Sequence, residues 1–254
     1  MNKPKIIYYY QTFSSLKKIL YPNTPVTHIH LSSIHFGGNS DNTPYIHLND
    51  YTPYDKKFNS VWEELEIAKN LGIKIVLMVG GAGGAFQNLF SEFEIYYPLL
   101  KKLILDKKII TGIDLDIEEE VQLDDVKKLI RQIKNDLGND FTIALAPVQS
   151  SLQNDIIGMG GFIYKDLYNS EEGKSIEYFN GQFYYDYSET SYTQAIENGY
   201  PSQQVVMGMI SGQNYKEELT LIYQKYKDNF GGVFIWEYYN SPDEWLKNVE
   251  NILS

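Results

Sequence analysis

The sequence predicts a (β/α)8 TIM barrel, an α/β fold in which eight parallel strands close into a cylinder inside a ring of helices. Three observations support this prediction: short apolar runs alternate with longer amphipathic stretches, eight such runs are present, and the chain has 254 residues. A barrel of this kind needs roughly 250 residues, so we expect a single domain over residues 1–254.

The eight apolar runs have the length and composition of strands that are buried on both faces. They cover residues 6–10, 28–33, 73–79, 110–117, 142–146, 178–184, 205–209 and 232–236. Apolar residues at helical spacing predict helices over residues 58–71, 123–137, 214–229 and 242–253. The connections 37–57 and 147–176 are long, and we expect them to form walls of a substrate cleft.

The composition excludes several classes of function. Without cysteine, the chain has no disulfide, no thiolate nucleophile and no cysteine-ligated zinc. A net charge of -11 argues against nucleic acid and membranes as partners, and no apolar run has membrane-spanning length. The first residues lack the apolar core of a signal peptide, which is compatible with the cytosol or the exterior. We expect a monomer without cofactor or metal.

The most informative stretch is the fourth predicted strand, which reads IITGIDLDIEEE over residues 109–120. Strand side chains alternate between faces, so Asp114, Asp116 and Glu118 share one face while the intervening aliphatic residues share the other. The aliphatic face must pack against the helices, which directs the three acids into the barrel near the carboxyl ends of its strands, where barrel active sites lie. A solvated acidic edge strand is disfavoured, because barrel strands are covered on both faces.

Buried carboxyls without counter-charges are costly, so these three are expected to share protons, and such groups tend to mark function. Glu119 and Glu120 lie beyond the end of the strand. We expect them to be loop or helix-cap residues.

The pattern Asp-x-Asp-x-Glu over residues 114–118, preceded by Gly112, resembles the signature of glycoside hydrolase family 18. That family has the (β/α)8 fold and includes chitinases and endo-β-N-acetylglucosaminidases. Three more segments resemble family motifs: 78–81 (MVGG), 182–184 (QFY) and 232–236 (GVFIW), which ends in a tryptophan. A closer likeness is to endo-β-N-acetylglucosaminidases of the Endo T type. It adds 10–12 (YQT), 47–50 (HLND), 144–148 (ALAPV), 180–184 (NGQFY) and 236–241 (WEYYNS), in the same order.

The resemblance implies a substrate-assisted mechanism, a known exception to the usual pair of enzyme carboxylates. Glu118 would protonate the leaving oxygen while the carbonyl oxygen of the substrate's N-acetyl group attacks the anomeric carbon. Asp116 would accept the acetamido N–H, and Tyr184 would donate its hydroxyl to the acetamido oxygen. Water would then open the oxazolinium ring with retention, Glu118 acting as base. Asp114 is expected to share a proton with Asp116, so that the trio titrates as a coupled set.

Other residues near the predicted strand ends are expected to bind the sugar. Trp236 is the expected stacking floor, although a large aromatic also serves as a barrel plug. For Tyr8, core packing and substrate contact are equally open. By alternation two polar residues share a face with Tyr184, and the glycines after the third strand are expected to bring backbone close to the sugar. The expected substrate-binding residues are Tyr8, Gln11, Gly80, Gly81, Asn180, Gln182 and Trp236.

The chain departs from the family pattern at three places. Thr111 stands where many members have an acid, the second strand continues past Ser32 without the usual phenylalanine, and Tyr185 replaces an asparagine or aspartate. The last two departures bear on the shape and contacts of the cleavage subsite. His28 and His30 share a strand face, but no third ligand stands at a recognisable spacing, so we interpret them as structural or hydrogen-bonding residues.

Three functions remain open at this point. The first is an endo-β-N-acetylglucosaminidase that cuts the chitobiose core of N-glycans, and the second is an endochitinase with the same chemistry. The third is a non-catalytic carbohydrate-binding protein on the same barrel, which ranks lower because the expected catalytic residues are all present. The expected partner in each case is a glycan that contains N-acetylglucosamine.

Overall fold

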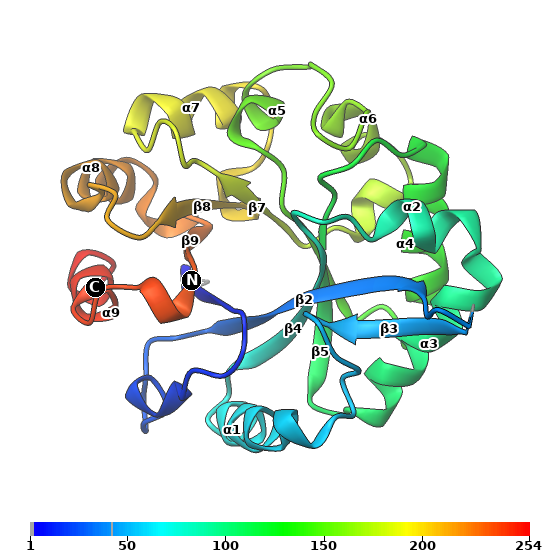
Figure 1. Cartoon of the computed structure of the whole chain (residues 1–254). Helices are drawn as coiled ribbons and strands as arrows, with labels where there is room; N and C mark the ends of the chain where they lie inside the picture. Colours follow the sequence, from blue (N-terminus) through cyan, green and yellow to red (C-terminus); the bar gives the residue numbers. More distant parts are fainter. Residues whose placement is uncertain (1–2, 42) are drawn as a thin grey trace.

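Eight strands of the computed structural model, which describes residues 3–41 and 43–254, close into a parallel barrel (Figure 1). They are β1 (Lys5–Tyr10), β2 (His28–Gly38), β4 (Lys74–Gly80), β5 (Ile110–Asp116), β6 (Thr142–Leu145), β7 (Tyr178–Gln182), β8 (Val205–Ile210) and β9 (Gly232–Trp236). Neighbouring strands pair in parallel, and β1 pairs with both β2 and β9, which closes the cylinder. The predicted barrel is confirmed.

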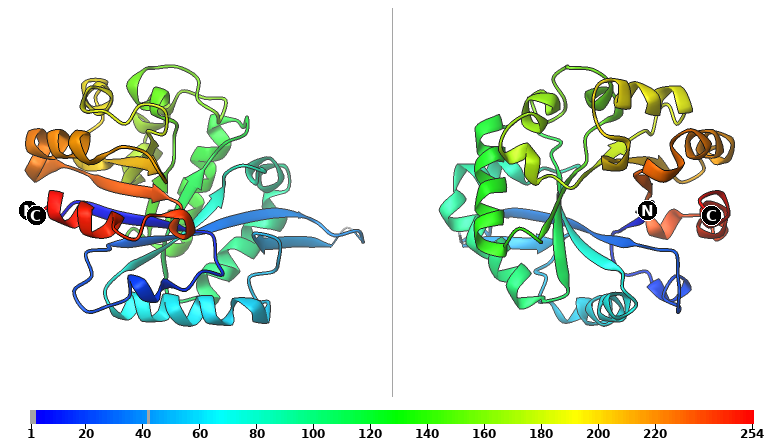
Figure 2. Two further views of the ribbon diagram at one scale, coloured as in Figure 1. Left: turned by 60° about the vertical axis from the view of Figure 1, so that its left-hand side comes forward. Right: turned by 180° about the vertical axis from the view of Figure 1, so that it is seen from behind.

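Helices surround the barrel (Figures 1 and 2). They are α1 (Asn59–Asn70), α2 (Phe86–Ser91), α3 (Phe93–Asp106), α4 (Leu123–Leu137), α5 (Gln149–Gln153), α6 (Tyr164–Tyr168), α7 (Glu189–Glu197), α8 (Lys216–Tyr226) and α9 (Trp245–Ile252). Short 3-10 turns complete the connections: η1 (Leu16–Lys18), η2 (Lys56–Phe58), η3 (Glu172–Ser175), η4 (Ser202–Gln204), η5 (Lys227–Asn229) and η6 (Tyr238–Asn240). No helix of the described residues is both long and apolar enough to cross a bilayer.

The helix predictions hold best where the apolar pattern is strongest. The bounds of α4 are those predicted, and its buried face consists of Val126, Leu129, Ile130 and Ile133. Each such side chain stabilises the fold by about 1.5–3 kcal/mol relative to its exposed state. The predicted last helix instead begins three residues late, because Pro242 opens a turn in which its carbonyl accepts a hydrogen bond from the Trp245 N–H.

A ninth strand, β3 (Pro44–Leu48), lies inside the connection that the sequence led us to describe only as a long loop. It pairs antiparallel with the second half of β2, from Ile34 to Gly38, and the two form a hairpin that extends beyond the barrel wall (Figure 2). The ring of Tyr45 stacks on His47 with centroids 3.8 Å apart. Because β2 continues past the barrel, the hairpin stands at the end of the barrel where β2 finishes.

Two apolar layers separate the inside of the barrel from its outside. The outer layer lies between strands and helices and includes Ile113, Leu115 and Ile117, the aliphatic residues that alternate with the acids. The inner layer fills the cylinder and consists of Ile7, Tyr9, Met78, Ala144, Tyr178, Val206 and Phe234. The residues of β5 that face outward are therefore those that the alternation predicts.

Candidate active site

The three acids of the β5 segment lie on the inner side of the barrel. Asp114 is in register with Met78 and Ala144, both of the inner layer, and its side chain is fully buried. Asp116 is also buried, whereas Glu118 is half-buried. The carboxyls thus form a column that runs from the barrel interior toward its mouth.

One oxygen of Asp114 accepts three hydrogen bonds. Its Oδ2 lies 2.5 Å from the hydroxyl of Tyr9, 2.8 Å from Nδ1 of His30 and 3.1 Å from Nδ2 of Asn180. The other oxygen, Oδ1, is buried and has no partner among the described residues. The interpretation of His30 as a hydrogen-bonding residue is confirmed.

Asn180 differs from the expectation that it lines the sugar site. Its side chain is fully buried and donates to Asp114, so it supports the carboxyls from within the barrel. Alternation along β7 does place it on the face of Gln182, but at greater depth. The expectation failed because alternation specifies a face and not a depth.

Gln182 joins the two carboxyls nearest the mouth. Its Nε2 lies 3.1 Å from Oδ1 of Asp116, 3.3 Å from Oε1 of Glu118 and 2.9 Å from the carbonyl oxygen of Ala146. An amide group has two N–H donors, so these three acceptors share them. Gln182 therefore bridges the two carboxyls from the end of β7, two strands away from β5.

The surroundings favour the protonated forms of Asp116 and Tyr184. Burial raises the pKa of Asp116 well above 3.8, and the charges of Glu118 and Asp114 raise it further, while the hydrogen bond from Gln182 opposes this. Burial also raises the pKa of Tyr184, followed by the charges of the three acids. Tyr184 consequently keeps its phenolic proton and is a hydrogen-bond donor.

Aromatic rings enclose this space. Tyr184 meets Phe234 edge-on at 6.1 Å, and Trp236 lies 5.4 Å from Tyr9 between ring centroids. Tyr184 and Trp236 both pack against the inner apolar layer, and Trp236 stays half-buried. Trp236 thus lies at a strand end with its indole half-buried, and its role as a stacking floor stays a prediction.

The expectation that Tyr8 reaches the same pocket is wrong. Its ring packs on the outer side of the barrel, 4.8 Å from Trp245 and 5.3 Å from Tyr238. The inward residue is its neighbour Tyr9, because successive strand side chains alternate. Gln11 lies just after β1 with an exposed side chain, and its carbonyl oxygen accepts a hydrogen bond from Asn49.

Gly80 and Gly81 bring the end of β4 against Asp116. Both have positive φ, +95° and +80°, which side chains rarely adopt. The Gly81 N–H donates to the Asp116 carbonyl oxygen at 2.8 Å. A Cβ at Gly80 would lie 2.3 Å from that carbonyl oxygen, and one at Gly81 would lie 3.3 Å from Oδ2 of Asp116. The glycines therefore fit the backbone around the carboxyl, and their contact with a sugar stays a prediction.

Glu119 caps a helix, as expected of a residue beyond the strand. Its carboxylate accepts hydrogen bonds from the backbone N–H groups of Ala85, Phe86 and Gln87 at the start of α2. The residue that precedes α2 supplies no side-chain cap of its own. The two adjacent glutamates therefore have different positions. Glu118 lies toward the barrel mouth, and Glu119 contacts the N-terminus of α2.

Asn49 is a residue that the sequence reasoning did not single out, although it lies in the HLND segment. Its Nδ2 lies 3.0 Å from the Gln11 carbonyl oxygen and 3.2 Å from that of Ser32, and its Oδ1 accepts from the Ser33 N–H. The peptide bond between the two serines is cis. Asn49 therefore ties the chain just after β1 to the middle of β2, and it has a left-handed φ of 54°, which asparagine adopts more readily than most residues.

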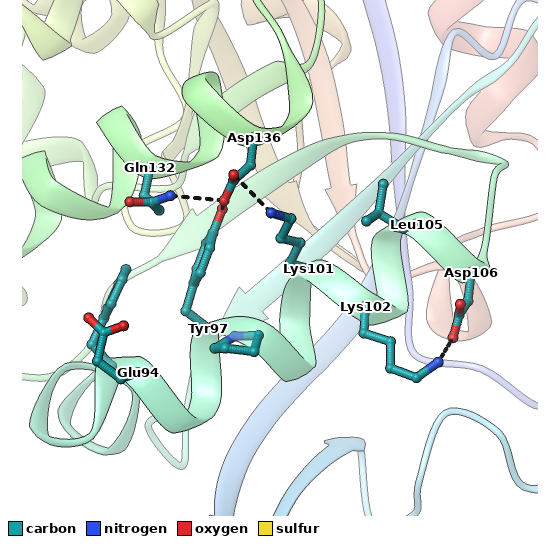
Figure 3. A pocket seen from close by; sticks show the side chains of 10 residues that line it. Glu94, Tyr97, Lys101, Lys102, Leu105, Asp106, Gln132 and Asp136 are labelled. Atoms are coloured by element: carbon teal, nitrogen blue, oxygen red, sulfur yellow. Dashed lines mark hydrogen bonds and ion pairs between the residues drawn. The ribbon is translucent and has the colours of Figure 1, made fainter.

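A surface cavity of about 470 Å³ between α3 and α4 lies away from these strand ends (Figure 3). Its central carboxylate, Asp136, pairs with Lys101 at 2.8 Å and accepts hydrogen bonds from Gln132 and Tyr97. The Lys101 contact and then the Gln132 hydrogen bond lower the pKa of Asp136 to about 2. We interpret this cavity as a satisfied surface network. Within residues 3–41 and 43–254, no group of three or more acidic or histidine side chains is placed to hold a metal ion.

No protein-family model and no curated protein matches the sequence. Among solved structures, the chitinase ChiC from Aspergillus fumigatus is 33% identical with a TM-score of 0.85, over 94% of this chain and 93% of that one. A fungal endo-β-N-acetylglucosaminidase of glycosyl hydrolase family 18 is 30% identical with a TM-score of 0.85, over 98% of both chains. A family 18 chitinase from Pseudoalteromonas aurantia, 19% identical with a TM-score of 0.74, supports the barrel fold alone. With this identity and coverage, and with its acids inside the barrel, the chain is a hydrolase that belongs to glycoside hydrolase family 18.

Proposed function

We propose that the chain is a retaining endoglycosidase that hydrolyses the β-1,4 bond after N-acetylglucosamine, acting on the chitobiose core of N-glycans. The observation that carries this proposal is the Gln182 amide, which holds Asp116 and Glu118 together beside the protonated Tyr184. Such a group offers one acid near solvent, one carboxyl inside, and one phenol donor. These are the three partners that a substrate-assisted mechanism needs from the enzyme.

In the first step Glu118 transfers its proton to the glycosidic oxygen, because it is the carboxyl nearest the barrel mouth. The bond from the anomeric carbon to that oxygen breaks, and the acetamido carbonyl oxygen of the substrate forms the new bond. Asp116 accepts the acetamido N–H and stabilises its developing positive charge. Tyr184 donates its hydroxyl to the acetamido oxygen and holds it in line for attack.

In the second step water attacks the anomeric carbon of the oxazolinium ion, and the bond from that carbon to the acetamido oxygen breaks, which restores the N-acetyl group. Glu118, now ionised, takes a proton from that water and returns to its starting state, so the atoms and charges balance over the cycle. Two displacements at one carbon retain its configuration. Asp114 contacts no reacting atom in this scheme. It shares the proton of Asp116 from below.

Two observations support an N-glycan over a linear chitin chain. The motif order resembles that of endo-β-N-acetylglucosaminidases of the Endo T type, and one similar structure carries that activity in its name. Two structured connections also flank the end of β5. The hairpin of β2 and β3 contacts the connection that follows β4, where Nδ1 of His35 lies 2.7 Å from the Gly84 carbonyl oxygen, and a Cβ at Gly84 would lie 2.9 Å from Glu119. The connection between β6 and β7 reaches it through Gly160, whose carbonyl accepts from the Val121 N–H.

An endochitinase is the second candidate, favoured by the 33% identity to a fungal chitinase. The two activities are separated by incubating the purified protein with a high-mannose glycoprotein and, separately, with chitin oligomers. Release of an intact glycan from the glycoprotein supports the proposal, and release of chitobiose from the oligomers alone supports the chitinase. Glycan binding without turnover of either substrate contradicts both and indicates a non-catalytic binding protein.

The catalytic assignment has a matched control in the adjacent residue. Glu118→Gln keeps the shape but removes the proton that is transferred, so we expect turnover to fall by roughly 10²–10⁴-fold with glycan binding retained. Glu119→Gln changes an equally long side chain that faces α2, and we expect it to leave turnover nearly unchanged. Substantial turnover in Glu118→Gln, or equal losses in both variants, contradicts the assignment.

A further inference from the structure

A buried chain of hydrogen bonds runs beneath the catalytic carboxyls. His30 is fully buried, with Nδ1 at 2.8 Å from Oδ2 of Asp114 and Nε2 at 3.1 Å from the hydroxyl of Tyr178. Tyr178 is also fully buried, and its hydroxyl contacts no other partner among the described residues. The order from the interior outward is therefore Tyr178, His30, Asp114.

The donors and acceptors in this chain follow from its chemistry. Among the described residues the Tyr178 hydroxyl contacts only Nε2 of His30, so Nε2 accepts its hydrogen and Nδ1 is the nitrogen that carries a hydrogen toward Asp114. Burial, followed by the charge of Asp114, raises the pKa of Tyr178 well above its ordinary value, so Tyr178 keeps its proton. Tyr178 then donates to Nε2, which fixes the neutral tautomer of His30 without any unsatisfied nitrogen.

The two inner carboxyls receive unequal numbers of donors. Asp114 accepts from Tyr9, His30 and Asn180 on one oxygen, and hydrogen bonds to the charged form favour it. Asp116 accepts a hydrogen bond from the Gln182 side chain alone, which it shares with Glu118. A proton shared by the pair therefore resides on Asp116, where it lies next to Glu118 and the substrate.

We propose that His30, held by Tyr178, is a positioning residue that keeps Asp114 the ionised member of the carboxylate trio. The inference rests on the proposed function, because it assigns His30 a role in that site's proton distribution. His30 touches no reacting atom and acts through Asp114. The titratable groups that face Asp114 are Tyr9, His30, Asp116, Glu118, Tyr164 and Tyr184. Those that face His30 from other sides are His28 and Tyr178.

Two polar substitutions test the contacts of the two ring nitrogens of His30 one at a time. In His30→Asn the side-chain amide takes the place of Nδ1, which keeps a donor to Asp114 and loses the contact with Tyr178. In His30→Gln the amide takes the place of Nε2, which keeps the contact with Tyr178 and loses the donor to Asp114. His28→Gln is the matched control, because His28 is also buried inside β2 but bonds to Thr27 and not to an acid.

The readout is the pH profile of kcat/KM on the better of the two glycan substrates. Loss of a donor to Asp114 makes negative charge on the trio less favourable. We expect His30→Gln to move the alkaline limb upward by about one pH unit and to lower the maximum about tenfold. His30→Asn and His28→Gln are expected to leave the limb in place. Equal profiles for His30→Gln and His30→Asn would overturn the proposal.

Thermal unfolding against pH decides the same question without turnover. In His30→Gln the folded state lacks a hydrogen bond that favours the charged carboxylate, so this variant is expected to lose more stability than wild type as pH increases from about 4 to 7. Curves for His30→Gln and His28→Gln that run parallel would also refute the role of His30. If the wild-type protein hydrolyses neither glycan, the proposed function fails, while these unfolding curves still test the role of His30.

Discussion

Removal of the Glu119 side chain tests whether Glu119 caps α2 while its neighbour Glu118 is the catalytic acid. Its carboxylate accepts hydrogen bonds from three backbone N–H groups at the start of α2, the one from Phe86 at 2.6 Å and the one from Gln87 at 3.2 Å. Loss of an N-cap costs about 1 kcal/mol, and a buried N–H left without a partner costs about 1–3 kcal/mol. Ala85 and Phe86 are buried, so we expect Glu119→Ala to destabilise the protein by about 2–3 kcal/mol.

For a chain of this length, 1 kcal/mol corresponds to roughly 2–4 °C in Tm, so the expected loss is about 5–10 °C. Glu119→Gln keeps the oxygen that contacts Ala85 and Phe86 and replaces only the one that faces Gln87, so its loss should be smaller. Thermal unfolding by circular dichroism measures both, and kcat at 25 °C should stay near wild type in both. An unchanged Tm in Glu119→Ala refutes the cap, and lost turnover in a folded protein at 25 °C refutes the assignment of residue 118 as the acid.

Two further predictions follow from the barrel interior. Burial and the charges of Glu118 and Asp114 raise the pKa of Asp116 in the folded protein above 3.8. The protonated carboxyl therefore contributes stability that is fully present below pH 3.8 and is lost as the pH rises through the raised pKa. Asp116→Asn should therefore flatten the decline of Tm between about pH 4 and pH 7, and a decline as steep as that of wild type would contradict the pKa direction. Tyr9→Phe should lower kcat/KM about tenfold, because it removes the hydrogen bond from Tyr9 to Asp114. Tyr8→Phe should leave kcat/KM unchanged, because Tyr8 packs outside the barrel. The reverse ranking would mean that Tyr8, and not Tyr9, faces the barrel interior.

The barrel could be predicted because parallel strands that are buried on both faces appear in the sequence as short, nearly continuous apolar runs. The β5 segment shows this best, since acids alternate with Ile113, Leu115 and Ile117 and fix both the strand and its phase. In β1 the inward residue, Tyr9, stands in a run of three tyrosines at 8–10, where no alternation shows which of them faces the site.

Contacts between distant segments are the part that alternation does not specify. Asn180 lies on the predicted face, but its depth depends on the register of β7 against β8, which no local pattern encodes. The β3 strand was missed because it opens with Pro44 after a polar turn and has only five residues. The bridge that Gln182 makes between Asp116 and Glu118 required three side chains from two strands, and only coordinates bring these together.

The hairpin of β2 and β3 has a consequence for the solubility of the protein. A closed barrel is free of edges, because every strand has a neighbour on each side. In the described part of the chain β3 is the strand that pairs with a single other strand, although the main chain of its last residue, Leu48, bonds to that of Tyr51. The five-residue length of β3 and its opening proline limit strand addition at this edge, and the end of β2 beyond Ile34, which is paired with β3, forms the other short edge of the hairpin.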